Sequence, residues 1–289
     1  MTRARRLTTG SAAVVLVLAL PVTASAAPAV FGGHLGTNDD PIVLTTDAAF
    51  KKLTGTVIAF DNPCDDGKTQ VFHESVPVVA AKPGLLTLGR WVMTKNAKGS
   101  FTGTFQRNLN LDGGRGLVLT MKLHGTLGRT GGSGTLSAHS TITDVPAITP
   151  TLPTSINLLQ TCDTGTLKWK VVHRPGVVYG GRTSSGEAFV LTLSASRRSV
   201  KQVDVGWHAA CVPDGFFDYP DTLINFSLTG GRFGGSFRWT PEGTTTNVDY
   251  VMRGKVSRAS SSGSLAVKVT FADGTSCDTG NTSWTARSS

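Results

Sequence analysis

The chain has 289 residues, enough for one large domain or two of ordinary size. Hydrophobic residues make up 39% and charged residues 16%, and the 34 glycines interrupt every long apolar run, which excludes both a disordered chain and a helical bundle. The formal net charge is +9, but beyond the N-terminus no run of lysine and arginine exceeds two residues. Proteins that bind nucleic acid gather such charge in a patch, so we expect no nucleic-acid partner.

Residues 1–26 have the three parts of a secretory signal peptide. Three arginines within the first six residues are followed by the apolar stretch Ser11–Val22 and by the small residues of Ala24-Ser25-Ala26. The apolar stretch is shorter than the roughly 20 residues that span a bilayer. We therefore expect a protein that is secreted, extracellular or associated with the cell surface, with no transmembrane segment. Loss of the three arginines lowers the net charge from +9 to +6.

The remaining chain repeats itself at an offset of 148 residues. The first copy begins with Val30-Phe31-Gly32-Gly33, and the second with Val178-Tyr179-Gly180-Gly181. At the same offset, Ile42-Val43-Leu44 falls on Val190-Leu191-Thr192 without a gap, and Cys64 then meets Cys211 after a slip of one residue. A repeat of this length predicts two copies of one domain.

Later segments match in the same chain order. Residues 101–105 align with 233–237, and the hairpin 125–136 aligns with 254–265. Each copy closes with Cys-Asp-Thr-Gly followed by tryptophan. The matches predict a first domain over 27–172, a Pro/Gly-containing linker over 173–176 and a second domain over 177–289.

Apolar and polar residues alternate along most segments, as in Leu117, Leu119, Met121 and Leu123, and Gly/Ser clusters separate these segments. This period of two is typical of strands with one buried face and one wet face. We expect an all-β fold of two tandem homologous antiparallel domains, with seven or eight strands each. Each domain is expected to be a meander barrel or a sandwich, and the close succession of hairpins favours the barrel.

Four cysteines allow three pairings, and the duplication favours the two pairings within the copies. Export to an oxidising compartment favours disulfides over free thiols. We expect Cys64–Cys162 in the first domain and Cys211–Cys277 in the second.

Linear motifs of catalysis are scarce. The two Asp-Thr-Gly sequences, at Asp163 and Asp278, resemble the paired loops of aspartic proteases, but here each motif ends its domain and follows a cysteine. That placement favours a tight turn instead. The six histidines show no metal-ligand spacing, and no nucleophile-elbow motif occurs. We expect no catalytic residue, no metal and no cofactor.

One segment of the second domain combines carboxylates with aromatic rings. After Cys211, three acids alternate with three aromatics, whereas the equivalent segment of the first domain lacks the aromatic cluster. Rings that stack on sugars beside carboxylates that accept hydrogen bonds are one interpretation, and rings that pack under the sheet are the other. The candidate binding residues are Asp214, Phe216, Phe217, Asp218, Tyr219 and Asp221.

Together, the Phe-x-Gly-x-Phe segment, the Gly-Thr/Ser-Leu hairpins and the Cys-Asp-Thr-Gly/Trp ending resemble small secreted β-domains of high-GC bacteria that have no characterised function. This resemblance covers both copies and implies export and a disulfide, but it assigns no binding residue. Streptavidin-like and lipocalin-like barrels have a similar glycine-rich spacing of strands, but their ligand-binding signatures do not occur in this sequence.

The sequence favours a non-catalytic binding protein whose partner is an extracellular glycan, a protein surface or a small apolar ligand. Two classes remain as alternatives: a secreted hydrolase without a linear motif, and a structural envelope protein or inhibitor that presents the proline-rich segment near Val145–Pro153. The oligomeric state and the ligand do not follow from the sequence.

Overall fold

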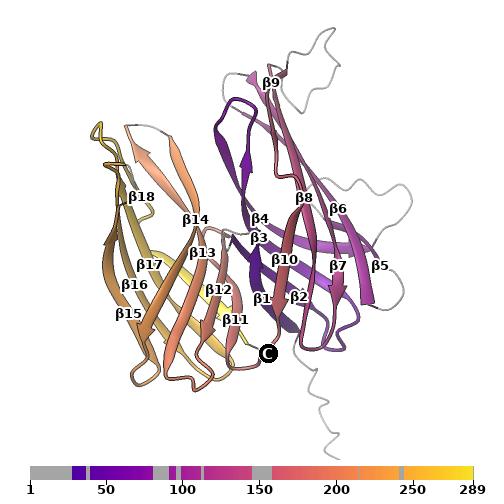
Figure 1. Cartoon of the computed structure of the whole chain (residues 1–289), viewed down its shortest axis with the longest axis vertical. Helices are drawn as coiled ribbons and strands as arrows, with labels where there is room; N and C mark the ends of the chain where they lie inside the picture. The colour runs from indigo at the N-terminus through magenta and orange to yellow at the C-terminus, as the bar shows by residue number, and fades with distance from the viewer. Residues whose placement is uncertain are drawn as a thin grey trace, which may run out of the picture.

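The computed structural model describes residues 28–36, 40–80, 91–95, 99–111, 114–144, 158–213, 215–240 and 244–288. The expected signal peptide and the proline-rich segment lie outside these residues. Within the described ranges every secondary-structure element is a β-strand. The strands form two sheets that stand side by side (Figure 1). The expected all-β fold is confirmed, and its strands divide between two sheets, one for each expected domain.

The first domain is one sheet of ten strands. Its strands are β1 (Ala29–Leu35), β2 (Asp40–Thr46), β3 (Leu53–Pro63), β4 (Thr69–Ala80), β5 (Trp91–Lys95), β6 (Ser100–Asn110), β7 (Gly116–Leu127), β8 (Gly131–Thr143), β9 (Leu158–Asp163) and β10 (Leu167–Val172).

The second domain is one sheet of nine strands. Its strands are β11 (Val178–Thr183), β12 (Ala188–Leu193), β13 (Ser199–Val212), β14 (Phe216–Ser227), β15 (Arg232–Trp239), β16 (Asn247–Val256), β17 (Ser260–Thr270), β18 (Ser276–Asp278) and β19 (Thr282–Arg287).

Alternation along the strands builds both cores. In β7, Leu117, Leu119, Met121 and Leu123 are buried while the residues between them point outward. Strands of the second domain alternate in the same way around a core that contains Trp207, Tyr250 and Trp284, each at most 2% exposed. The sheets hold more strands than the seven or eight expected because β5, β9 and β18 have only three to six residues, too few for alternation to reveal.

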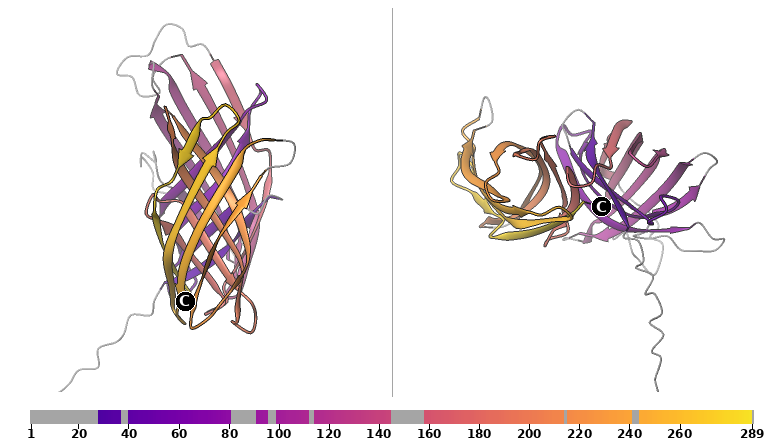
Figure 2. Two further views of the ribbon diagram at one scale, coloured as in Figure 1. Left: turned by 90° about the vertical axis from the view of Figure 1, so that its left-hand side faces the viewer. Right: turned by 90° about the horizontal axis from the view of Figure 1, so that it is seen from below.

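Both sheets curl strongly, so that each looks like an open cup from below (Figure 2). In the second domain, β13, β12, β11, β19, β17 and β18 pair in a closed ring, which decides the earlier alternative in favour of a barrel there. Strand β14 extends this ring on one side, and β16 and β15 extend it on the other. In the first domain β10 pairs with both β1 and β8, and β5 is inserted between β4 and β6. The pairing of β4 with β5 is parallel, an exception to the expected antiparallel pattern.

Strand register corrects one detail of the sequence alignment. Gly32 pairs with Val43 in the first sheet, and Gly180 pairs with Val190 in the second. Val43 therefore corresponds to Val190 and not to Leu191, so the one-residue slip lies in the turn between the first two strands rather than just before the cysteine. From β2 through β4 the equivalent residues are 147 positions apart, as Val43 and Val190 are.

The two domains pack through reciprocal contacts of equivalent residues. A Cβ atom on Gly32 would lie 2.8 Å from Val190 and 3.0 Å from Val178, and a Cβ on Gly180 would lie 2.7 Å from Val30 and 2.8 Å from Val43. Glycine at both positions thus lets the backbones of β1 and β11 approach the opposite domain closely. Valines of both domains form a buried cluster around these glycines.

Candidate functional site

The repeated Cys-Asp-Thr-Gly motif forms a structural turn in each domain. Disulfides join Cys64 to Cys162 and Cys211 to Cys277, as expected. The amide of Gly165 donates to Asp163 at 2.6 Å, and the amide of Gly280 donates to Asp278 at the same distance. The threonine between them accepts a hydrogen bond from the neighbouring strand, from Ala138 N in one domain and Val267 N in the other. Each carboxylate is thus engaged within its own sheet and its own turn, which assigns the motif to the backbone and not to an aspartic-protease dyad.

The tryptophan that follows each motif explains the repeated glycines. Trp169 lies against Gly125 and Gly134, where added Cβ atoms would come within 2.1 and 2.7 Å of the indole ring. Trp284 lies in the same way against Gly254 and Gly263. Both indoles are buried (2% and 1% exposed), so this shared pattern serves the core.

The acidic and aromatic segment after Cys211 is mainly a strand and not a loop, because β14 begins at Phe216. Of the candidate binding residues, Asp214 lies outside the described residues. The other five divide between the two faces of β14, since alternate residues of a strand point to opposite sides. Phe217, Tyr219 and Asp221 face the barrel interior, whereas Phe216 and Asp218 face outward.

Phe217 and Tyr219 pack against the core of the second domain. Their rings are nearly parallel, at 6.3 Å, and both contact Trp207. Phe217 also meets Phe271 edge-on at 5.4 Å. They therefore pack on the core, and the structure does not bring the three predicted rings into one exposed platform.

The outer face of β14 has a different environment. Phe216 is 71% exposed and stacks on His208 with ring centroids 4.7 Å apart. The Nδ1 atom of His208 and the Asp218 carboxylate form a short hydrogen bond. This face offers one exposed ring at a hairpin tip, next to Val212, which is 69% exposed.

Asp221 lines a pocket between the edge strands β14 and β15. The pocket has a volume of about 470 Å³, in the range of small-molecule sites. Its lining is mainly apolar and comes from β14, β15 and β16: Asp221, Thr222, Leu223, Ile224, Phe237, Arg238, Trp239 and Tyr250. Here the pairings of the second sheet stop, since β14 and β15 are the two ends of its strand order.

Aromatic rings form the wall of this pocket. Phe237 stacks on Tyr250 with centroids 4.7 Å apart and planes 7° from parallel. Trp239, two residues further along the inner face of β15, is 44% exposed. The other four of the five tryptophans in the chain are at most 2% exposed, so Trp239 stands apart from every structural tryptophan.

The polar chemistry of the pocket centres on Asp221. The Tyr250 hydroxyl donates a short hydrogen bond to its carboxylate, and the amide of Thr222 donates another at 2.7 Å. Burial raises the pKa of Asp221, and the two donated hydrogen bonds offset part of that rise. Burial and the neighbouring carboxylate raise the pKa of Tyr250 as well, so its phenol stays protonated as a donor. Arg238 does not neutralise Asp221, because Asp249 holds its guanidinium at 2.6 and 2.9 Å.

The first domain is closed at the corresponding place. Strand β5 fills the gap between β4 and β6, and its Trp91 is fully buried against Phe105. Beside it, Arg107 Nη1 donates to Glu74 at 2.9 Å. The second domain lacks a fifth-strand equivalent, because only four residues separate β14 from β15. The pocket thus exists in one domain and not in the other.

Of the residues that build this pocket, only Asp221 was among the sequence candidates. Phe237 and Tyr250 were indistinguishable from core residues, because alternation alone does not reveal where a sheet ends. Trp239 could have been noticed from the repeat, because the equivalent residue of the first domain is the charged Arg107.

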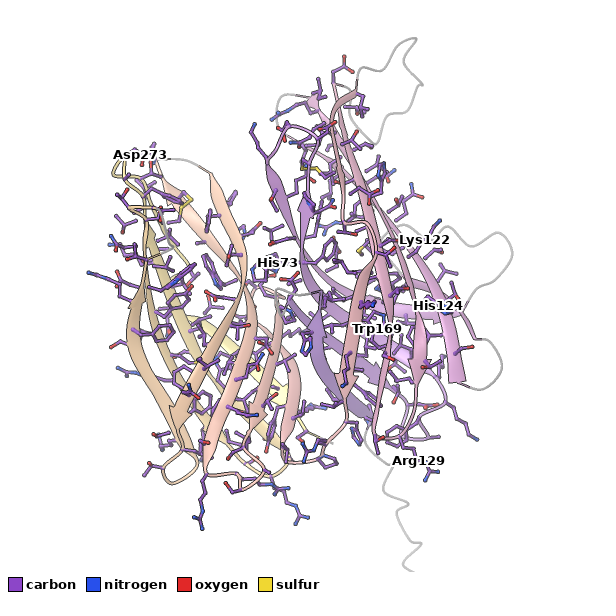
Figure 3. All side chains as sticks on the ribbon, in the orientation of Figure 1. His73, Lys122, His124, Arg129, Trp169 and Asp273 are labelled. Carbon is purple, nitrogen blue, oxygen red and sulfur yellow. A yellow bond between two sulfur atoms is a disulfide. The ribbon has the colours of Figure 1, made fainter. Side chains whose placement is uncertain are left out.

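Two other places in the molecule differ from this pocket. A groove of about 480 Å³ runs between the domains beside Arg182 and Arg287, and small residues, mainly valines, glycines, threonines and serine, line most of it. His73 points from the first sheet toward the second in the middle of the molecule (Figure 3), and forms a buried ion pair with Glu187. Both places join the domains, and neither combines an exposed ring with a buried carboxylate.

No protein-family model and no curated protein matches this sequence. Among solved structures, the chain is similar to a candidate AttH from Nitrosomonas europaea. The two are 12% identical, the match covers 96% of this chain and 98% of the other, and the TM-score is 0.19. At that score the likeness carries no argument about fold or function.

No group of three or more potential metal ligands occurs among the described residues. The same residues include no helix that is long and apolar enough to cross a membrane.

Proposed function

We propose that this chain is a secreted binding protein without a catalytic site, whose second domain holds a small organic ligand against the aromatic wall of the pocket between β14 and β15. The signal-peptide pattern and two disulfides support an oxidising, extracytoplasmic location. The pocket lining offers one carboxyl and one phenol with no histidine, cysteine or second carboxyl beside them. Such a set binds and orients a ligand but does not assemble an acid–base or nucleophile–base pair.

The observation that carries this proposal is the half-exposed Trp239 beside the stacked pair of Phe237 and Tyr250. Exposing a large ring to water is unfavourable unless a ligand covers it, and flat aromatic walls suit sugar or aromatic rings. In the first domain, strand β5 and its buried Trp91 fill the same region, so no pocket remains there.

Fluorescence of the intact, oxidised protein tests the proposal, because Trp239 is the one tryptophan that solvent and ligands reach. We expect p-cresol and methyl β-glucoside, as neutral ring probes, to shift its emission and to reduce its quenching by acrylamide. Phe237→Ala should abolish the response. Val251→Ala, which shortens an exposed side chain on the outer face of the same strand as Tyr250, should not. Absence of any response to ring compounds, or a response unchanged in Phe237→Ala, would contradict the proposal.

A second candidate function rests on the hairpin tip at Phe216 and Val212, which are both about 70% exposed. Adjacent exposed apolar side chains suit a surface partner or an insoluble glycan. Co-sedimentation with peptidoglycan, chitin and cellulose tests it. Retention that a Phe216→Ala/Val212→Ser variant loses, while Phe237→Ala keeps it, would favour the tip over the pocket.

A further inference from the structure

The two domains provide an internal comparison for the pocket carboxylate. Glu74 lies opposite Ile58 in the first sheet, and Asp221 lies opposite Val205 in the second, at equivalent positions of the register. On the strand across the gap, Phe101 pairs with a glycine of β7 and Phe233 with the equivalent glycine of β16. Arg107 lies six residues after Phe101, and Trp239 lies six residues after Phe233. Arg107 and Trp239 therefore occupy equivalent positions. The acid is thus kept in both domains, while an arginine in one is replaced by a tryptophan in the other.

In the first domain this acid has a cationic partner. Glu74 has a side chain only 5% exposed, and the Arg107 guanidinium reaches it from the opposite strand at 2.9 Å. A buried carboxylate is costly unless an opposite charge and hydrogen bonds compensate it. In the first domain, the guanidinium of Arg107 therefore compensates the charge of the buried Glu74 carboxylate.

In the second domain the same acid has only neutral donors. Tyr250 and Thr222 donate to Asp221, and no ion pair reaches it among the described residues. Arg238 lies nearby but is held on the outer face by Asp249. Where the guanidinium of Arg107 would lie, the second domain has a pocket walled by Trp239, Phe237 and Tyr250. Aromatic faces attract cations, and a carboxylate at the end of the same pocket adds a charge-assisted hydrogen bond.

We propose that the pocket binds an organic cation, a guanidinium or ammonium group on an apolar stem, with the charge at Asp221 and the stem between Trp239 and the Phe237–Tyr250 stack. This inference rests on the proposed function, because it names the ligand class of the same pocket. The cation takes the place that Arg107 occupies in the first domain. The source of the cation is either a free small molecule or an arginine or lysine side chain of a peptide.

Four probes of similar size separate charge from shape. They are n-butylguanidinium, n-butylammonium, the neutral n-butylurea and the anionic pentanoate, titrated into the intact oxidised protein near pH 7 and followed by Trp239 fluorescence and calorimetry. We expect both cations to bind at least tenfold more tightly than butylurea, and pentanoate not to bind. A capped tripeptide with a central arginine then separates the two sources: tighter binding than butylguanidinium would assign a peptide, and weaker binding a free small molecule.

Two variants test the geometry. Asp221→Asn keeps the shape of the side chain and should reduce cation affinity at least tenfold while leaving p-cresol binding within about twofold. Trp239→Arg rebuilds the ion pair of the first domain and should abolish binding of every probe without loss of thermal stability, which also keeps the test valid if Asp221→Asn folds poorly. Asp273→Asn, an acid-to-amide change at an exposed hairpin tip (Figure 3) that does not line the pocket, is the matched control and should leave cation binding unchanged.

The outcomes separate the two proposals. Binding of p-cresol with no preference for cations, or cation binding unaffected in Asp221→Asn, would overturn the cation inference and leave the ring-binding pocket intact. Failure of ring compounds and cations alike would overturn both. Cation binding that survives in Trp239→Arg would place the cation elsewhere on the protein and also reject the inference.

Discussion

His73 of the first domain and Glu187 of the second form an ion pair across the domain interface, with each side chain 8% exposed. The imidazole lies directly over Gly206 of β13, where an added Cβ would come within 2.5 Å of the ring. On the adjacent strand β3, burial raises the pKa of Asp61, and the nearby His73 offsets part of that rise. The two domains thus meet at their centre through this buried polar contact as well as through valine packing.

Removing one partner of this pair should destabilise the protein strongly. Glu187→Gln or His73→Leu leaves the other group buried without its polar partner, which typically costs about 1–3 kcal/mol. We expect a lower urea midpoint for each variant, and a double variant less unstable than the sum of the two. Asp66→Asn, which removes an exposed pair with Lys68, is the control and should leave the midpoint unchanged. Additive effects of His73→Leu and Glu187→Gln would show that the two groups are not coupled.

The reciprocal glycines at the interface should tolerate no side chain. Gly32→Ala and Gly180→Ala each place a Cβ within 3.0 Å of stiff valine side chains of the other domain, and we expect a loss of about 1–3 kcal/mol in each case. Gly235→Ala is the matched control, because nothing lies within 4 Å of its added Cβ and its backbone is extended. Differential scanning calorimetry measures both effects. Melting temperatures equal to that of Gly235→Ala would mean that the interface yields without cost.

Each disulfide should stabilise its own domain by constraining the unfolded chain. The bonded cysteines are 98 residues apart in the first domain and 66 in the second, separations for which the chain-entropy model gives about 4–5 kcal/mol. We expect Cys64→Ala/Cys162→Ala to lose slightly more free energy of unfolding than Cys211→Ala/Cys277→Ala. Guanidinium titrations of the two double variants make the comparison. A loss below about 1 kcal/mol in both would argue against this contribution.

Stability should depend on pH through Asp221. Burial raises the pKa of this carboxyl above its ordinary value, so the folded protein holds the proton more tightly than the unfolded chain does. The resulting stabilisation is complete below the unfolded pKa and is lost as the pH rises through the folded pKa. Tyr250, Tyr219 and Thr222 face the same group, and no cation among the described residues reverses the direction.

Asp221→Asn isolates this effect. We expect the free energy of unfolding of the variant to rise relative to that of the wild type as the pH is raised from 3 to 7, since the amide does not ionise. Urea titrations at pH steps of one unit measure the difference. A difference that stays constant or falls with pH would contradict the assigned direction of the shift.

Much of the fold could be predicted because it depends on local pattern. Alternation located long strands such as β7 and β16, and the order of the cysteines in the two copies indicated both disulfides. Strand β5 could not be found this way, because Trp91–Lys95 is too short to show alternation and its pairing with β4 is parallel, unlike that of a hairpin. The one-residue change in offset between the two copies, in the turn that joins their first two strands, could not be located from the sequence either. Such a change in a turn leaves the apolar pattern of both strands intact.

The candidate site shows the same limit more sharply. The segment after Cys211 was recognised by composition, but composition does not tell which side of a strand a ring faces. The strand period assigns Phe217, Tyr219 and Asp221 to one side once the strand itself is known. The pocket depends on Asp221 meeting residues of β15 and β16 at an unpaired edge, and that edge exists only because the second domain lacks the segment that forms β5.

The contacts around Gly32 and Gly180 have the form of a symmetric association. Each glycine receives two valines of the other domain, and these valines are themselves equivalent residues. A surface whose patch fits its own copy is the kind that builds twofold homodimers. A single copy of this domain, released from the chain, would present a face already shaped for its twin. Fusion into one polypeptide would then free the two halves to diverge. One half fills the gap in its sheet with its own strand, and the other leaves a gap to be filled from outside.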